Sequence, residues 1–267
     1  MSKNLITLKN NQESHISYSE FKTFTECPYK RYLQYEKRIE TPSNIYMDYG
    51  TAIHECTQSF YDQKGEGLIS YELRLKKVLN DHPEVSDKEK KSFFEGGRRV
   101  AQEVIRGLKR LFNQGYELAE TEKFVWTPTA SGIFFKGYID FLLRKGEGWH
   151  ILDLKTTTKG WKPYKFKDEV VLSQLRLYKH FYAKQEGVSE NGISTYYIFG
   201  KRDTKIKPVE FVKIESGKGS TARAIKALDD ATYLIQKGDI TKAKDERQPK
   251  RFSPCKYCEF NHTEHCP

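Results

Sequence analysis

Three neighbouring segments of strand-like sequence near the middle of the chain constrain the fold more than any other feature. The segments at about 121–127, 133–144 and 149–155 are rich in β-branched and aromatic residues, and short turns with proline or glycine separate them. Such a pattern predicts three consecutive antiparallel strands. Because helical patterns lie on both sides of this block, we expect a mixed α/β domain with a central sheet flanked by helices.

The flanking segments can be assigned in the same way. Ser17 and Glu20 have the spacing of a capping box, so a short helix should begin there after a polar lead-in, and Pro28 can begin a second helix. The remaining expected elements are a helix from Gly50, helices within 68–116 with a break at Pro83, a helix at 170–185, strands at 193–200 and 209–215, and a helix at 220–236.

Two aspartates on neighbouring predicted strands indicate a metal site. Asp140 ends the sequence Gly-Tyr-Ile-Asp, and Asp153 and Lys155 lie two apart in the next strand. On a strand, Asp153 and Lys155 point to one face, and Leu152 and Leu154 point to the other. Burying such charges is costly without a partner, and Mg²⁺ held by both carboxylates would be one. Lys155 could then position a water or stabilise charge on a phosphate. An Asp–Lys pair at a strand end, with Asp140 in a turn, is the alternative.

Charge and cysteine content narrow the class of protein. With 46 Lys and Arg against 36 Asp and Glu, the net charge is +10 at pH 7, which favours a polyanionic partner such as nucleic acid. The first twenty residues have no apolar core of the signal-peptide type, and no run of about eighteen apolar residues could span a membrane, so we expect a reducing cytoplasm. In that setting clustered cysteines more often bind a metal than form disulfides.

Five motifs, in order along the chain, resemble those of a known family. They are Cys27-Pro28-Tyr29-Lys30, the G-x-x-x-H of Gly50 to His54, the G-x-x-D of Gly137 to Asp140, the D-x-K-T of Asp153 to Thr156 and the Q-x-x-x-Y of Gln174 to Tyr178. Together they resemble the PD-(D/E)xK nucleases, in particular the RecB-like branch, which includes the nuclease domains of RecB and AddB and the Cas4-type nucleases. The resemblance implies a restriction-endonuclease-like α/β core.

The resemblance implies a single nuclease domain over 1–267. Within it we expect N-terminal helices with the first cysteine at 1–48, a helical region at 49–118, the catalytic α/β core at 119–215, and a C-terminal helix with a cysteine-rich tail at 216–267.

The resemblance also assigns a metal site. It implies that His54, Asp140, Asp153 and the carbonyl of Leu154 bind Mg²⁺ or Mn²⁺, and a histidine ligand somewhat favours Mn²⁺. From the residues alone, His54 could instead be a capping or core histidine.

Three further residues receive catalytic roles from the same resemblance. Lys155 would be the catalytic lysine. Gln174 and Tyr178, one helical turn apart, would line the site and contact the DNA backbone or the lysine. The alternative places both on a solvated helix face.

The resemblance further implies an iron–sulfur cluster. In the RecB-like branch one cysteine before the core and three after it hold a [4Fe–4S] cluster. The corresponding residues are Cys27, Cys255, Cys258 and Cys266. The gap before the last cysteine is longer than the family's usual spacing and contains His262 and His265, so a zinc site and a site without metal stay open. We expect Cys56 to be a packed thiol.

A basic loop follows the D-x-K-T motif. Lys159, Lys162 and Lys165 alternate there with Trp161 and Tyr164. Lysines bind phosphates and aromatic rings stack on bases, so the loop is predicted to bind single-stranded DNA. A solvated loop whose aromatic residues pack inward is the alternative.

These features predict a metal-dependent deoxyribonuclease, chiefly an exonuclease on single-stranded DNA ends, with possible flap or endonuclease activity. No Walker-type motif occurs, so a helicase would be a separate partner. DNA recombination, repair, replication and CRISPR adaptation, in a cell's own cytoplasm or that of a viral host, are the expected settings. The alternatives are a non-catalytic or a zinc-stabilised nucleic-acid-binding module on the same fold.

Overall fold

The computed structural model describes residues 14–41, 43–62, 67–238, 255 and 258–266. The main elements are β1 (His15–Ser17), α1 (Tyr18–Glu26), α2 (Pro28–Arg31), α3 (Ile45–Asp62), α4 (Gly67–Asp81), α5 (Asp87–Phe112), β2 (Glu117–Pro128), β3 (Phe134–Lys145), β4 (Gly148–Thr157), α6 (Glu169–Glu186), β5 (Ile193–Lys201), β6 (Val209–Ile214) and α7 (Lys218–Lys237). A π-helical turn at Tyr32–Glu36 follows α2, and short 3-10 turns lie at Pro163–Lys167 and Glu190–Gly192. Within these residues no helix combines the length and the apolar character that crossing a membrane requires.

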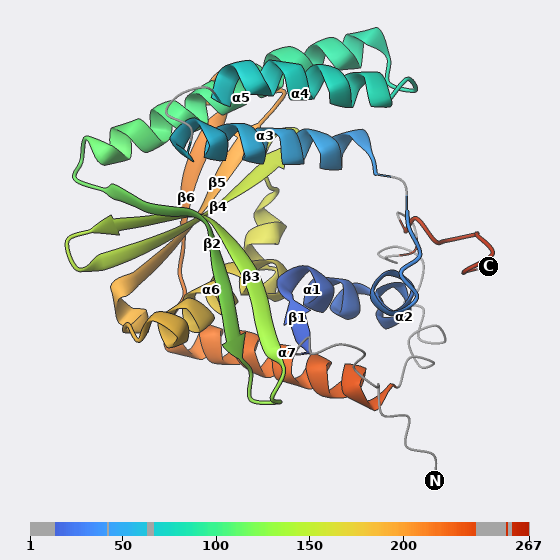
Figure 1. Ribbon diagram of the computed structural model, residues 1–267, viewed down its shortest axis with the longest axis vertical. Helices are drawn as coiled ribbons and strands as arrows, with labels where there is room; N and C mark the ends of the chain where they lie inside the picture. Colours follow the sequence, from blue (N-terminus) through green and yellow to red (C-terminus); the bar gives the residue numbers. More distant parts are fainter. Residues whose placement is uncertain (1–13, 42, 63–66, 239–254, 256–257, 267) are drawn as a thin grey trace.

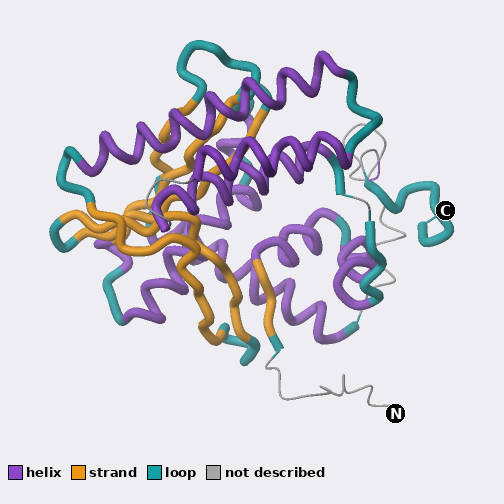
Figure 2. Tube along the Cα trace, turned by 45° about the horizontal axis from the view of Figure 1, so that its top comes forward, coloured by secondary structure: helices purple, strands orange, loops and turns teal. Residues whose placement is uncertain are grey.

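The described strands form one mixed sheet, which confirms the predicted fold class. β2, β3 and β4 pair antiparallel, β4 and β5 pair parallel, and β6 is antiparallel to β5. β1 adds in parallel to the start of β3. Figure 1 shows α3, α4 and α5 on one side of the sheet and α1, α6 and α7 on the other, and the tilted view in Figure 2 keeps the strands between the same two groups of helices.

Each face of the sheet carries its own apolar core. Leu152 and Leu154 of β4 pack with Ile53 of α3 and with residues of α5. Residues of β3 and β5, such as Ile139 and Tyr197, pack with α6 and α7. Because alternate residues of a strand face opposite sides, the burial of Leu152 and Leu154 on the α3 side directs Asp153 toward α6.

Strand β3 has an interruption along one edge. β2 pairs with one edge of β3 from Phe134 to Arg144, so β1 and β4 must both use the other edge. β1 pairs with residues 134–136 and β4 with residues 141–145. Residues 137–140 therefore pair with neither of these strands. We call this stretch the open edge.

Several local features differ from the expectations. Strand β1 was not predicted: residues 1–15 are expected as a polar lead-in and Ser17 as a helix cap, and three residues are too short for an alternation pattern. Ser17 does cap α1 by accepting a hydrogen bond from the Glu20 N–H, but the Glu20 carboxylate binds the Arg31 guanidinium, at 2.8 Å from Nε, instead of closing the capping box. Helix α3 begins before Gly50, at Ile45. The tail assigned as loop falls largely outside the described residues, as does most of the N-terminal lead-in.

Candidate active site

The open edge brings the predicted metal-binding side chains together. Asp140 comes from β3, Asp153 from β4 and His54 from α3. His54 Nδ1 lies 3.4 Å from Asp140 Oδ2. The same oxygen accepts a 2.7 Å hydrogen bond from the Leu154 N–H. Since β3 and β4 separate at this point, the Asp140 side chain takes the place of the missing strand partner and is fixed against β4.

Asp153 lies between a lysine and a glutamine. Lys155 Nζ is 2.8 Å from Asp153 Oδ2, and Gln174 Nε2 donates to Asp153 Oδ1 at 2.8 Å. Gln174 Nε2 also lies 3.5 Å from the Tyr178 hydroxyl. Gln174 and Tyr178 are both buried, so the alternative of a solvated helix face is wrong for this pair.

The two carboxylates have different electrostatic environments. Burial raises the pKa of Asp153 to about 6, and the neighbouring Asp140 carboxylate adds to this rise against the effect of Lys155. Burial acts in the same direction on Asp140, but His54 and Lys155 outweigh it, so the pKa of Asp140 is lowered. Burial acts to lower the pKa of His54, and the Asp140 carboxylate more than offsets this, so it is raised. Two buried acids are thus compensated by an imidazole and an ammonium group.

The acids are not arranged as a ready metal cage. In the described part of the chain, no group of three or more His, Cys, Asp or Glu side chains could hold a metal ion as it stands. At the two aspartates, the carboxylate oxygens already have other contacts. Lys155 and Gln174 occupy the two oxygens of Asp153, and the Leu154 N–H and His54 approach one oxygen of Asp140.

Two hollows open from the site. The α3 groove is lined by Tyr46, Met47, Gly50, Thr51, His54, Glu55, Gln58, Glu122 and Thr156. The tail groove has a volume of about 660 Å³ and runs from Lys155 and Gln174 past α1 and α2 to Cys258 and Glu259. Met47 lines both hollows; His54 lines the α3 groove, and Lys155 and Gln174 line the tail groove.

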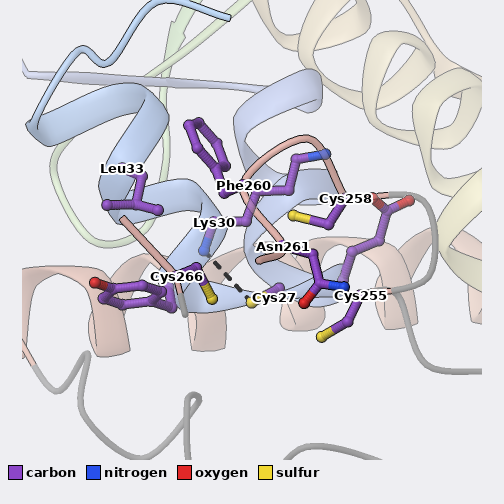
Figure 3. A pocket seen from close by; sticks show the side chains of 10 residues that line it. Cys27, Lys30, Leu33, Cys255, Cys258, Phe260, Asn261 and Cys266 are labelled. Atoms are coloured by element: carbon purple, nitrogen blue, oxygen red, sulfur yellow. Dashed lines mark hydrogen bonds between the residues drawn. The ribbon is translucent and has the colours of Figure 1, made fainter. Parts of the chain in front are cut away.

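Four of the cysteines line a single pocket, shown in Figure 3. They are Cys27, Cys255, Cys258 and Cys266. Leu33 and Phe260 contribute to the same pocket, whereas neither His262 nor His265 is among its described lining residues. Cys27 also caps α2, because its Sγ accepts a 3.4 Å hydrogen bond from the Lys30 N–H. Cys56 of α3 is fully buried in the core that α3 shares with α5.

Polar contacts hold the cysteine-rich tail against α2. Lys30 Nζ lies 2.8 Å from the Glu259 carboxylate, across 229 positions of sequence. The Tyr29 hydroxyl donates to the His265 carbonyl at 2.9 Å. These contacts bring the two ends of the described chain together at the cysteine pocket.

The basic loop divides into buried and exposed residues. The Trp161 ring packs on Tyr197 and Phe199, with ring centroids 4.9 and 4.8 Å apart. Lys159, Lys162 and Tyr164 are exposed, and Lys165 is half-buried. For Trp161 this is the arrangement of the inward-packing alternative, and Tyr164 is the ring that the loop presents to solvent.

The sequence reasoning missed a second aromatic surface, on β2 and β3. The Phe124 ring lies 5.8 Å from Trp126 and 5.1 Å from Tyr138, and Trp126 stacks on Phe134 at 5.1 Å. Phe124 and Tyr138 are 41% and 46% exposed, and Lys136 is the register partner of Trp126. The available signal was the placing of aromatic residues at alternate positions on the faces opposite buried Val125 and Ile139. We call this the β2–β3 aromatic surface.

Replacing Gly137 by alanine is expected to disturb the site through Tyr178. A Cβ at this position would lie 2.6 Å from Tyr178 Cε1 in the core. Overpacking of this kind costs about 1–3 kcal/mol, so we expect a lower melting temperature by circular dichroism and a lower rate of the nuclease reaction that the motifs imply. Gly192→Ala is the matched control, since a Cβ there meets nothing within 4 Å. Equal melting temperatures for the two variants would contradict the prediction.

Comparison with known proteins identifies the class. The family model of the PD-(D/E)XK nuclease superfamily matches residues 15–266. The chain therefore belongs to this superfamily, whose members are metal-dependent nucleases that typically use Mg²⁺ or Mn²⁺. Among solved structures, the crystal structure of SSO0001 matches 94% of this chain and 86% of its own, at 12% sequence identity and a TM-score of 0.43. A search of curated proteins gave no match.

Proposed function

We propose that this chain is a deoxyribonuclease of the RecB-like branch that degrades single-stranded DNA from its ends. The observation that carries this proposal is the convergence of two buried carboxylates, an imidazole and an ammonium group at the open edge of β3. His54 lines one groove, and Lys155 and Gln174 line another, so a strand in either groove would lie next to the side chains that contact the two acids. This arrangement favours catalysis over the non-catalytic alternative, because a passive binding surface has no need of two buried acids.

The donor set fits a divalent cation. Asp140, Asp153 and His54 would hold it, with the Leu154 carbonyl as a further ligand, and carboxylate oxygens with one imidazole suit Mg²⁺ and Mn²⁺. The acids lie close enough for Asp140 to raise the pKa of Asp153, and a cation would relieve that repulsion. When bound, such an ion would stabilise the charge that develops on the phosphate and lower the pKa of a water molecule.

The other side chains would orient the reacting groups. Lys155 would present its ammonium group to the phosphate or to the attacking water. Gln174 fixes the orientation of the Asp153 carboxylate by its 2.8 Å hydrogen bond, as outer partners of metal ligands do. Tyr178 lies beyond Gln174 and supports it.

The surfaces around the site favour single-stranded DNA. The exposed Lys159 and Lys162, together with Tyr164, offer phosphate contacts and one aromatic ring next to β4. The β2–β3 aromatic surface offers more rings, and bases can stack on such rings only when they are unpaired. A separate helicase, in recombination, repair, replication or CRISPR adaptation, would be the natural supplier of such strands.

We also propose that the cysteine pocket holds a [4Fe–4S] cluster. Four thiols from the two ends of the chain line one pocket with apolar walls, and Cys₄ ligation is the usual arrangement for such a cluster. Zinc bound by the same four cysteines is the second candidate. A zinc site that uses His262 or His265 is disfavoured, because neither lines the pocket among the described residues.

End-labelled DNA tests the proposed specificity. We expect linear single strands to be shortened from an end in Mn²⁺ or Mg²⁺, while circular single strands persist and linear duplexes are degraded more slowly. EDTA should stop the reaction. Circles cut as fast as linear strands would show an endonuclease, and no cleavage of any substrate with either metal would refute the nuclease proposal.

A further inference from the structure

A small pocket beside the active site has the composition of an anion site. It has a volume of about 140 Å³ and lies between the start of α3, the end of β4 and the residue after β5. Its lining residues are Tyr46, Tyr49, Thr156, Thr157, Thr158 and Arg202. The Arg202 N–H donates to the Thr157 carbonyl and the Asp203 N–H to the Thr158 carbonyl, both at 2.9 Å. These hydrogen bonds hold the backbone of Thr157 and Thr158 against that of Arg202 and Asp203. We call this pocket the Tyr49 pocket.

One residue that lines this pocket has a buried hydroxyl without a described partner. Tyr49 is 2% exposed, and its hydroxyl oxygen makes no hydrogen bond with any residue that the structure describes. A buried hydroxyl without a partner costs free energy, because it has lost its hydrogen bonds to water. A ligand oxygen in the pocket would restore that bond.

The charge around this hydroxyl is positive. Arg202 lies with its guanidinium 3.8 Å above the Phe93 ring and donates from Nε to Asp203 at 2.9 Å. Behind it, Arg99 Nη2 lies 3.5 Å from the Arg202 carbonyl, and its buried Nε has no partner among the described residues. Burial raises the pKa of Tyr49, whereas both arginines act to lower it, as cations near a phenol do. Two guanidinium groups and one carboxylate leave a net positive charge.

Hydroxyl groups complete the set of donors. Thr156, Thr157 and Thr158 follow Lys155 directly and line the pocket together. Guanidinium and hydroxyl donors around a small cavity suit a tetrahedral phosphate oxyanion, which accepts several hydrogen bonds at once.

The Tyr49 pocket adjoins the catalytic site. Tyr46 and Thr156 line both this pocket and the α3 groove, which contains His54. A strand whose scissile phosphate lies at the open edge could therefore place another of its phosphates in the Tyr49 pocket. We propose that the Tyr49 pocket binds a phosphate group of the nucleic-acid substrate next to the one that is cleaved. This inference rests on the proposed nuclease function and names one contact of its substrate.

Binding measured without catalysis tests the inference. Fluorescence anisotropy in EDTA would compare the affinities of 5′-phosphorylated and 5′-hydroxyl single strands for the wild type, Tyr49→Phe and Arg202→Lys. Tyr49→Phe removes only a hydroxyl without a described partner, so its melting temperature should not fall. We expect about tenfold weaker binding, the usual effect of losing a hydrogen bond to a charged group. Tyr71→Phe is the control, because its hydroxyl is also buried without a described partner but does not line the pocket.

The outcomes separate the possible sources of the phosphate. A loss confined to the phosphorylated strand assigns the pocket to a terminal phosphate, and an equal loss for both strands assigns it to an internal phosphodiester. Inorganic phosphate alone is the third probe. Suppose that it raises the melting temperature of the wild type but not of Tyr49→Phe, while both pocket variants bind DNA strands as the wild type does. The pocket then binds free phosphate, and the inference is overturned. Wild-type affinities in both pocket variants also overturn it. Because no cleavage is measured, failure of the nuclease proposal would not produce these results.

Discussion

Replacing Asp153 by asparagine is expected to abolish DNA degradation while leaving the fold in place. The carboxylate is buried, lies 2.8 Å from Lys155 Nζ and accepts a hydrogen bond from Gln174. Asparagine keeps the size and the acceptor for Gln174 but loses the charge that a divalent cation needs. Since a bound cation supplies several kcal/mol of transition-state stabilisation, the rate should fall at least about a thousandfold. The measurement is Mn²⁺-dependent digestion of end-labelled single strands.

A matched control separates charge loss at the site from charge loss in general. Asp230→Asn makes the same chemical change on the exposed face of α7, where Asp230 pairs with Lys226 at 2.6 Å. We expect wild-type rates for this variant. Circular dichroism should show similar spectra for both variants, and DNA binding in EDTA should persist. If Asp153→Asn digests DNA as fast as Asp230→Asn, the cleavage comes from another site or from a contaminant.

Replacing Cys258 by alanine should remove the metal centre proposed for the cysteine pocket and destabilise the chain. The four pocket cysteines come from the two ends of the described chain, where Lys30 and Glu259 already meet across 229 positions of sequence. A centre that links such distant residues restricts the unfolded chain, and for a closed loop of this length the chain-entropy term is about 5.5 kcal/mol. We expect anaerobically purified wild type to be brown with bound iron, and Cys258→Ala to be colourless and to melt at a lower temperature.

Cys56→Ala is the control for a lost thiol. Cys56 is a buried residue of α3 that does not line the pocket, so this variant should keep its colour and iron content and lose only some packing energy. A colourless wild type that contains stoichiometric zinc would replace the iron–sulfur assignment by a zinc site. Unchanged metal content and melting temperature in Cys258→Ala would remove Cys258 from any metal centre.

Local patterns were enough to predict the elements that carry the candidate site. Runs of β-branched and aromatic residues between turns located β3 and β4, and the two-residue spacing placed Asp153 and Lys155 on one side of β4. Helical spacing placed Gln174 and Tyr178 together on α6. These relations depend only on neighbours in sequence, so they can be derived without knowing the tertiary structure.

Contacts between distant segments could not be derived in this way. β1 is defined by its pairing with β3, more than a hundred residues later. The Glu20 side chain binds Arg31 and does not complete the capping box of α1. The inward packing of Trp161 depends on Tyr197 and Phe199 of β5. The Tyr49 pocket is lined by Tyr49 of α3 and by Arg202, and no sequence motif connects these two residues.

The two ends of the tail groove are synthesised at different times. One end of this groove is formed by Lys155 and Gln174, and the other by Cys258 and Glu259, which are translated long after both. Strands β3 and β4 can therefore pair before the residues of the distal wall have been synthesised. At that stage the groove beside Lys155 and Gln174 would lack the wall formed by Cys258 and Glu259. Only when the tail folds back on α2 does the groove gain the wall that can restrict access.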